Sequence, residues 1–148
     1  MTKFYFLRED ILILEERINA LHKEIKDLAL EQGEANRQSS ENFGHDDACQ
    51  EAVYYRRTVV LSQLKDLVLM LNNAVVIEPQ KKFERVRFGA TVKLSDGRIM
   101  RIGSYAIYAQ HPMMTISYSS LLGKSLIGKQ VGDTITINNK EISVDDVY

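Results

Sequence analysis

The sequence predicts an α+β protein: an N-terminal antiparallel coiled-coil helical hairpin followed by a small, mostly antiparallel sheet domain. Two observations predict this class. Apolar residues repeat in heptads through much of the first half, and short runs of alternating apolar and polar residues fill the second half. The period changes near Pro79, which should end a helix, so we expect domains of residues 1–78 and 79–148.

The first helix is predicted by an unbroken heptad seam. Charged side chains lie between the seam positions, and neither Pro nor Gly interrupts the pattern before Gly33. The seam residues are Leu7, Ile11, Leu14, Ile18, Leu21, Ile25 and Leu28. Their alternating spacings of four and three place them on one stripe that packs against another helix. A helix from Leu7 to Ser40 would be roughly 50 Å long.

A second heptad seam predicts the partner helix. Its members, in the same fours and threes, are Val60, Leu64, Leu67, Leu71 and Ala74. A polar, turn-prone segment separates the two seams, with the chain reversal near residues 41–48. Two long helices joined by a short reversal form an antiparallel hairpin, which we expect to be a projecting arm.

Beyond Pro79 the pattern is that of short strands. The expected strands are 91–94, 98–102, 114–118, 134–137 and 141–144. Turn residues join two pairs of them into hairpins, at 95–97 and 138–140. Helical spacing over 120–129, ending near Gly128, predicts one short helix.

Composition excludes several classes of protein. The chain has 148 residues, of which 45% are hydrophobic and 26% charged, so it is not a disordered chain. Its 19 Lys and Arg against 20 Asp and Glu exclude a strongly basic nucleic-acid coat, although a local basic patch stays possible. The single Cys49 cannot form an intramolecular disulfide, and charges interrupt the apolar N-terminal stretch. We therefore expect a cytoplasmic protein.

Motifs in the second half resemble the Gre family of bacterial transcript-cleavage and transcription elongation factors (GreA/GreB-like). They are the stretches 88–92 (FGATV) and 116–129 (ISYSSLLGKSLIGK), and the pair Gly132-Asp133. Proteins of that family have an N-terminal coiled-coil hairpin and an FKBP-like C-terminal domain, in the order and sizes predicted here. The resemblance covers nearly the whole chain.

The resemblance implies docking on bacterial RNA polymerase through the C-terminal domain and insertion of the hairpin tip into the secondary channel. In the family, acidic tip residues help to hold a second Mg²⁺ and a water, and the polymerase then hydrolyses backtracked nascent RNA. Mg²⁺ prefers oxygen ligands, and a two-metal site stabilises the attacking and leaving oxygens. We expect no cofactor of the chain's own, a shared polymerase Mg²⁺, a monomer and no membrane partner.

The tip departs from the family pattern, which is an Asp, two residues, Glu-Asn-Ala, and a second Ala four positions later. Matching the alanines to Ala48 and Ala52 places Asp46 at the Glu position and Asp47 at the Asn position. Phe43 then occupies the upstream Asp position. The resemblance implies Asp46 and Asp47 as the catalytic carboxylates. The alternative is that they cap the second helix and complement its dipole.

Basic residues flank the tip. Arg37 precedes it and Arg56 and Arg57 follow it, so an antiparallel hairpin brings the three close together. The resemblance implies that they contact RNA phosphates; the alternative is a solvated helix face with ion pairs. A second basic run consists of Lys81, Lys82, Arg85 and Arg87. It favours a surface that contacts nucleic acid or polymerase; the alternative is that these side chains are only solvated.

Ser119, Ser120 and Leu121 lie where the family has its polymerase-docking loop, which typically ends in Ser-Pro. Leu121 replaces that proline. It either forms an exposed apolar anchor or starts the following helix and is buried.

The sequence allows three classes of function. The leading one is a Gre-like factor that stimulates cleavage of backtracked RNA, with a non-cleaving secondary-channel regulator as its variant. A prolyl isomerase or chaperone is disfavoured because the Phe and Tyr residues of the second half are scattered in the sequence. A coiled-coil adaptor would use the side of the hairpin instead of its end. No nucleophile set, P-loop or metal cluster is visible, so we expect an accessory factor with no independent active site.

Overall fold

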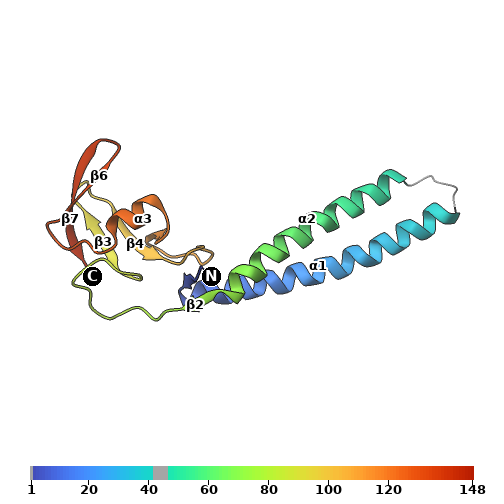
Figure 1. Ribbon diagram of the computed structural model, residues 1–148, viewed down its shortest axis with the longest axis horizontal. Coiled ribbons are helices and arrows are strands. Elements are labelled where there is room, and N and C mark those ends of the chain that lie inside the picture. Colours follow the sequence, from blue (N-terminus) through green and yellow to red (C-terminus); the bar gives the residue numbers. More distant parts are fainter. Residues whose placement is uncertain (1, 42–46) are drawn as a thin grey trace. The chain divides into compact units, whose positions relative to one another are not determined.

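The computed structural model describes residues 2–41 and 47–148, and the side chains of residues 35–49 lie outside the described part. The chain forms two compact units (Figure 1). The globular unit comprises Met1–Ile13 and Asn73–Tyr148, and the hairpin unit comprises Leu14–Asn72. This division differs from the expected 1–78 and 79–148, because both ends of the hairpin stem contribute residues to the globular unit.

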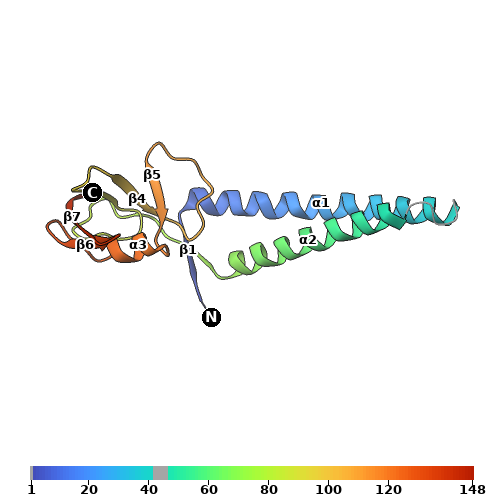
Figure 2. The ribbon, with the colours of Figure 1, turned by 90° about the horizontal axis from the view of Figure 1, so that it is seen from above.

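Two long helices form the hairpin unit. Helix α1 spans Arg8–Glu41 and α2 spans Asp47–Asn72, and they run side by side in Figures 1 and 2. The predicted seams face each other: Leu14, Ile18 and Leu28 are buried on α1, and Val60 and Leu64 on α2. The coiled-coil hairpin predicted from the heptads is therefore confirmed.

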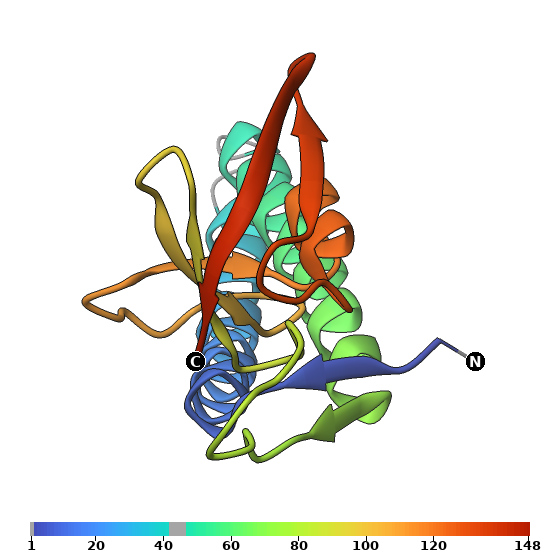
Figure 3. The ribbon, with the colours of Figure 1, turned by 90° about the vertical axis from the view of Figure 1, so that its left-hand side faces the viewer.

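Helix α2 ends six residues earlier than Glu78, where the sequence predicted its end. Residues Ala74–Val76 form strand β2, which pairs in parallel with strand β1, Phe4–Phe6 (Figure 3). Val75 and Val76 are β-branched and suit a strand. The first and last residues of this ladder are fixed by Phe4 N–H donating to the Asn73 carbonyl (2.9 Å) and Ile77 N–H donating to the Phe6 carbonyl (2.9 Å).

The globular unit is built on a five-stranded sheet with the order β5-β4-β3-β7-β6. The strands are β3 (Thr91–Leu94), β4 (Ile99–Gly103), β5 (Met114–Ser117), β6 (Thr134–Ile137) and β7 (Lys140–Val147). Both predicted hairpins are present as the antiparallel pairs β3–β4 and β6–β7. The β6–β7 turn uses Asn138 (φ 51°) and Asn139 (φ 64°), the left-handed conformations that a two-residue turn requires. Strand β5 pairs in parallel with β4, which the sequence did not indicate.

The core of the globular unit combines the sheet with the short helix α3, Leu121–Leu126. Leu126 of α3 is fully buried, as are Val92, Leu94, Met100 and Ile102 from the central strands. Helix α3 lies very close to β5, because a Cβ on Gly123 would be 2.1 Å from the Ser117 carbonyl oxygen. Only glycine fits there, and this contact sets the position of the α3 N-terminus.

Candidate functional site

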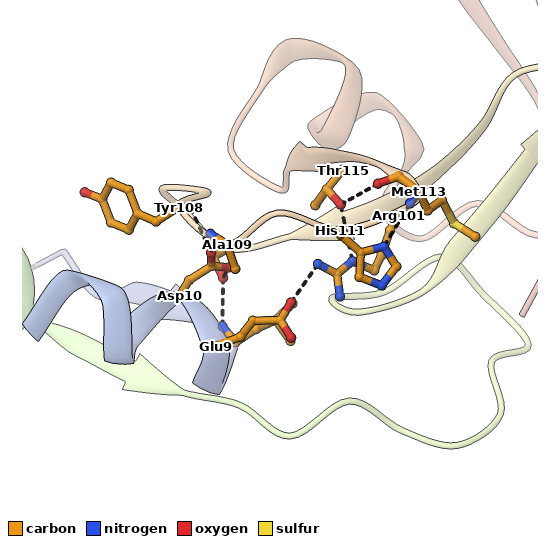
Figure 4. Close-up of polar contacts among 10 residues, drawn as sticks. Glu9, Asp10, Arg101, Tyr108, Ala109, His111, Met113 and Thr115 are labelled. Atoms are coloured by element: carbon orange, nitrogen blue, oxygen red, sulfur yellow. Dashed lines mark hydrogen bonds and ion pairs between the residues drawn. The ribbon is translucent and has the colours of Figure 1, made fainter. Parts of the chain in front are cut away.

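The base of α1 is held in the globular unit by a buried carboxylate, Asp10, which has no exposed surface (Figure 4). Its Oδ1 accepts hydrogen bonds from the backbone N–H groups of Tyr108 (2.8 Å) and Ala109 (2.9 Å). Its Oδ2 accepts one from the Ser104 hydroxyl (2.5 Å), whose oxygen accepts in turn from the Leu7 N–H (2.8 Å). A buried carboxylate is tolerated only when its oxygens are satisfied, so this network ties the first turn of α1 to residues 104–109.

A second contact reinforces the base. Arg101 of β4 donates to the Glu9 carboxylate at 2.7 Å, and its side chain is only 13% exposed (Figure 4). Sequence reasoning did not identify Glu9, Asp10 or Ser104 as functional. An acid in the first turn of a helix usually complements the helix dipole. Glu9 and Asp10 fit that ordinary role, so the local sequence does not indicate their partners in the fold.

In the stem, polar side chains of α1 and α2 contact each other at residues 31–32 and 56–57. Arg56 Nη2 lies 2.7 Å from each carboxylate oxygen of Glu31, and Arg57 Nη1 donates to Gln32 Oε1 at 3.1 Å. Arg57 Nε is buried without a hydrogen-bond partner. Of the two sequence interpretations of Arg56, the ion pair on a helix face is present.

The predicted catalytic residues fall outside what the structure describes. Asp46 lies in the undescribed segment, and so does Phe43. Asp47 is the first residue of α2, but its side chain and that of Arg37 are outside the described part. Catalytic and metal-binding roles at the tip therefore stay predictions.

The two helices of the stem do not pack equally closely along their whole length. A groove of about 520 Å³ lies between the helices and is lined by Arg17, Leu21, Gln63, Asp66 and Leu67. Leu21 and Leu67 are seam residues, yet both are only half-buried. The seam predicted which residues face the partner helix but not how closely they pack.

The predicted docking loop is a tightly bonded turn that presents Leu121. The Ser120 hydroxyl caps α3 by accepting from the Gly123 N–H (3.0 Å) and donates to the Ser117 carbonyl (2.7 Å). The hydroxyls of Ser119 and Ser117 lie 2.8 Å apart. Leu121 begins the helix and is 88% exposed. Leu121 therefore combines parts of the two alternatives. It is the first residue of the helix, but its side chain is exposed and not buried.

Aromatic residues that are scattered in the sequence meet in the globular unit. The ring centroid of Tyr118 lies 5.7 Å from that of Tyr5, 5.8 Å from Phe88 and 6.5 Å from Tyr105, and Tyr105 lies 4.5 Å from Phe4. Rings that are scattered in the sequence therefore lie close together in the globular unit. Non-local backbone contacts, including the Tyr105 N–H donating to the Tyr5 carbonyl (2.9 Å), bring them together.

Among the described side chains, those of residues 2–34 and 50–148, no group of three or more His, Cys, Asp or Glu is arranged to hold a metal ion. No helix in the described part of the chain is both long and apolar enough to cross a bilayer.

Comparison with known proteins identifies the family. A model of the family described as "Transcription elongation factor, GreA/GreB, C-term" matches residues 80–145. Transcription elongation factor GreA of Rhodospirillum rubrum is 32% identical over 139 residues, which cover 87% of this chain and 88% of that protein. GreA of Cereibacter sphaeroides is 30% identical over 127 residues, covering 80% and 84%. Among solved structures, the GreA factor homolog 1 (Gfh1) protein of Thermus thermophilus is 20% identical, with a TM-score of 0.48 over 99% of each chain.

The architecture is that of a two-part transcription factor, a coiled-coil hairpin followed by a mixed-sheet domain. The chain belongs to the GreA/GreB family of transcription elongation factors.

Proposed function

We propose that this elongation factor binds bacterial RNA polymerase through its globular unit and inserts the hairpin end into the secondary channel. There it stimulates cleavage of backtracked nascent RNA, acting as a monomer in the cytoplasm. The chain is an accessory factor that completes the metal site of the polymerase and has no active site of its own.

The observation that carries this proposal is the register of the stem. The pairs Glu31–Arg56 and Gln32–Arg57 are both centred near residue 44 of the sequence. Asp46 and Asp47 follow that centre by two or three positions. A hairpin with this register supports delivery of both carboxylates by its end, as a factor entering a narrow channel requires.

The chemistry follows from the types of residue. Mg²⁺ of the polymerase, shared at the tip, would polarise a water and the scissile phosphate, and it needs few protein carboxylates because it keeps waters. Asp46 and Asp47 would supply oxygen ligands to this ion and would accept hydrogen bonds from the water. Arg37, Arg56 and Arg57 contact phosphates of the RNA 3′ segment, for which Arg56 exchanges the Glu31 carboxylate for a phosphate.

Docking is assigned to Ser119, Ser120 and Leu121. The 88% exposure of Leu121 supports this role, because an apolar side chain on a rigid turn can anchor an interface while the surrounding hydroxyls form its polar rim.

A non-cleaving channel regulator is the second candidate. Phe43 occupies the position of one expected tip carboxylate, and the second acid of this stretch, Asp47, stands instead where the family has Asn. Such a factor would still dock and occupy the channel.

Binding tests the proposal first. Purified bacterial RNA polymerase should retain the full chain in a pull-down, and Leu121→Asp should lower retention at least tenfold. Met114→Asp, at another exposed apolar residue of the same unit (58% exposed), is the matched control and should bind like the wild type. Equal retention of the Leu121 and Met114 variants would reject the docking role, and no retention of the wild type would reject the function.

A further inference from the structure

The loop between β2 and β3 concentrates positive charge. We define the cationic loop as residues 80–88, which carry four cationic side chains and a single carboxylate, Glu84, in a chain whose net charge is −1. The cations are Lys81, Lys82, Arg85 and Arg87. All four are exposed. The sequence suggested a linker here, and the structure gives a more ordered arrangement.

The two ends of the cationic loop meet. Gly89 has a φ of +87°, and a Cβ added to it would lie 2.7 Å from Cβ of Pro79. The chain therefore leaves Pro79, passes through the loop and returns at Gly89 to the same point. Compact loops with adjacent ends are frequently functional.

The middle of the loop is fastened to the segment that follows α3. Val86 is fully buried; its N–H donates to the Lys129 carbonyl (2.7 Å), and its carbonyl accepts from the Gly128 N–H (2.8 Å). Arg85 Nη1 also donates to the Gly128 carbonyl (3.2 Å). These contacts hold the backbone of residues 85–87 in place, so binding an anion there costs less loop-ordering entropy.

The loop surrounds a polar cavity of about 330 Å³, lined by Gln80, Lys82, Glu84, Arg85 and Arg87. At about 30 Å³ per water, it has room for a phosphate group and part of its sugar. Three cations face one carboxylate there, and no apolar side chain lines it.

The charge of this cavity is not neutralised by the protein. Arg8, Arg98 and Arg101 of the same unit each pair with a carboxylate. By contrast, the side chains of Lys82 and Arg87, both within the described part of the chain, make no hydrogen bond or ion pair. Two cationic side chains without a protein partner beside a polar cavity attract an anion.

We propose that the cationic loop is a binding site for phosphodiester groups of a nucleic-acid backbone. Lys, Arg and Gln side chains commonly contact phosphates, and such contacts position a protein without reading sequence. An acidic protein surface is the less suitable partner, because protein interfaces centre on buried apolar or aromatic anchors and this lining has none. Glu84 opposes the anion and weakens the site.

Fluorescence anisotropy of the full chain with labelled mixed-sequence oligonucleotides tests the site, over about 50 to 200 mM salt. The double variant Lys82→Gln/Arg87→Gln should bind several-fold more weakly. Its slope of log affinity against log salt should fall by about 0.9 per lost contact on duplex DNA, or about 0.7 on single-stranded RNA. The arm that shows this fall identifies the source of the phosphate.

Two further variants sharpen the experiment. Glu84→Gln removes the opposing carboxylate and should tighten binding. Lys140→Gln, an exposed lysine of the same unit, is the matched control and should change neither affinity nor slope. Circular dichroism checks that each variant folds. The proposal is overturned if the double variant behaves like Lys140→Gln, if Glu84→Gln weakens binding, or if polyglutamate displaces the chain from a solid support better than nucleic acid does.

Discussion

The first turns of α1, which belong to the globular unit, are held there by a carboxylate with no exposed surface, whereas the rest of the helix contacts α2 through seam residues and exposed polar pairs. Three donors satisfy Asp10, while Glu31 and Arg56 are about half exposed. Burial makes an interaction costly to break, and exposure makes it cheap to exchange. The contacts of Asp10 are therefore suited to fixing the first turns of α1, and the exposed pairs of the stem are suited to exchanging partners.

The largest expected effect comes from the base. Asp10→Ala removes the acceptor of three buried hydrogen bonds and should lower the free energy of unfolding by about 4 kcal/mol, because the stranded donors cannot reach water. Urea unfolding followed by circular dichroism measures it. Asp10→Asn keeps one acceptor oxygen and should restore part of the loss. Glu9→Ala, at a 45% exposed acid, should cost about 1 kcal/mol or less, and a similar cost for Asp10→Ala would contradict the comparison.

Within the stem, packing differs along the seam. Leu14 is fully buried, so Leu14→Ala should cost about 3 kcal/mol. Leu67 is half-buried and borders the groove, so Leu67→Ala removes less contact and should cost about 1 kcal/mol. Urea midpoints of the two variants decide this, and equal losses would mean that the groove closes in solution.

One substitution should have opposite signs in the two units. Gly123→Ala places a Cβ 2.1 Å from the Ser117 carbonyl and should cost about 2 kcal/mol. Gly33→Ala, inside α1 with nothing within 4 Å of the new Cβ, should stabilise the protein by about 0.5 to 1 kcal/mol. Thermal melts of both variants provide the readout. Destabilisation by Gly33→Ala would show that α1 is not a regular helix at that point.

The exposed Glu31–Arg56 pair of the stem should contribute little to the free energy of unfolding. A double-mutant cycle on Glu31→Gln and Arg56→Gln should give a coupling energy of about 0.5 kcal/mol that decreases as salt is added. A coupling above about 2 kcal/mol would mean that this pair is a structural lock and not an exchangeable contact.

The smallest effect concerns the β3–β4 turn. The Arg98 backbone N–H, which donates to Asp96, holds the pKa of this carboxyl below its ordinary value of 3.8. A lowered pKa in the folded state contributes stability above the ordinary value, and this contribution is lost as the pH falls through the folded value. An NMR titration should place the midpoint below 3.8, and a midpoint above it would contradict the hydrogen bond.

The elements set by local patterns could be predicted from the sequence. The heptads located both helices, and turn residues located the hairpins 91–102 and 134–144. Elements set by distant contacts could not. Strands β1 and β2 have three residues each, and the whole hairpin separates them in the sequence. Ala74 also fits the heptad spacing of α2, so the sequence alone predicts helix where the structure has a strand.

The features of the candidate site also differ in how far the sequence predicts them. The exposure of Leu121 was one of two alternatives, because a helix period does not say whether the first turn is covered. The partners of Asp10 could not be inferred, since Ser104 and Tyr108 lie more than 90 positions away. The cationic loop was visible as a run of charge, but its closure by Pro79 and Gly89 was not.

Cleavage of RNA in purified, backtracked elongation complexes tests the central claim most directly. The wild type should shorten the RNA 3′ end. The Asp46→Asn/Asp47→Asn variant should still bind polymerase yet leave the RNA intact, and Asp66→Asn in the stem should act like the wild type. Cleavage by the tip variant at the wild-type rate would contradict the account.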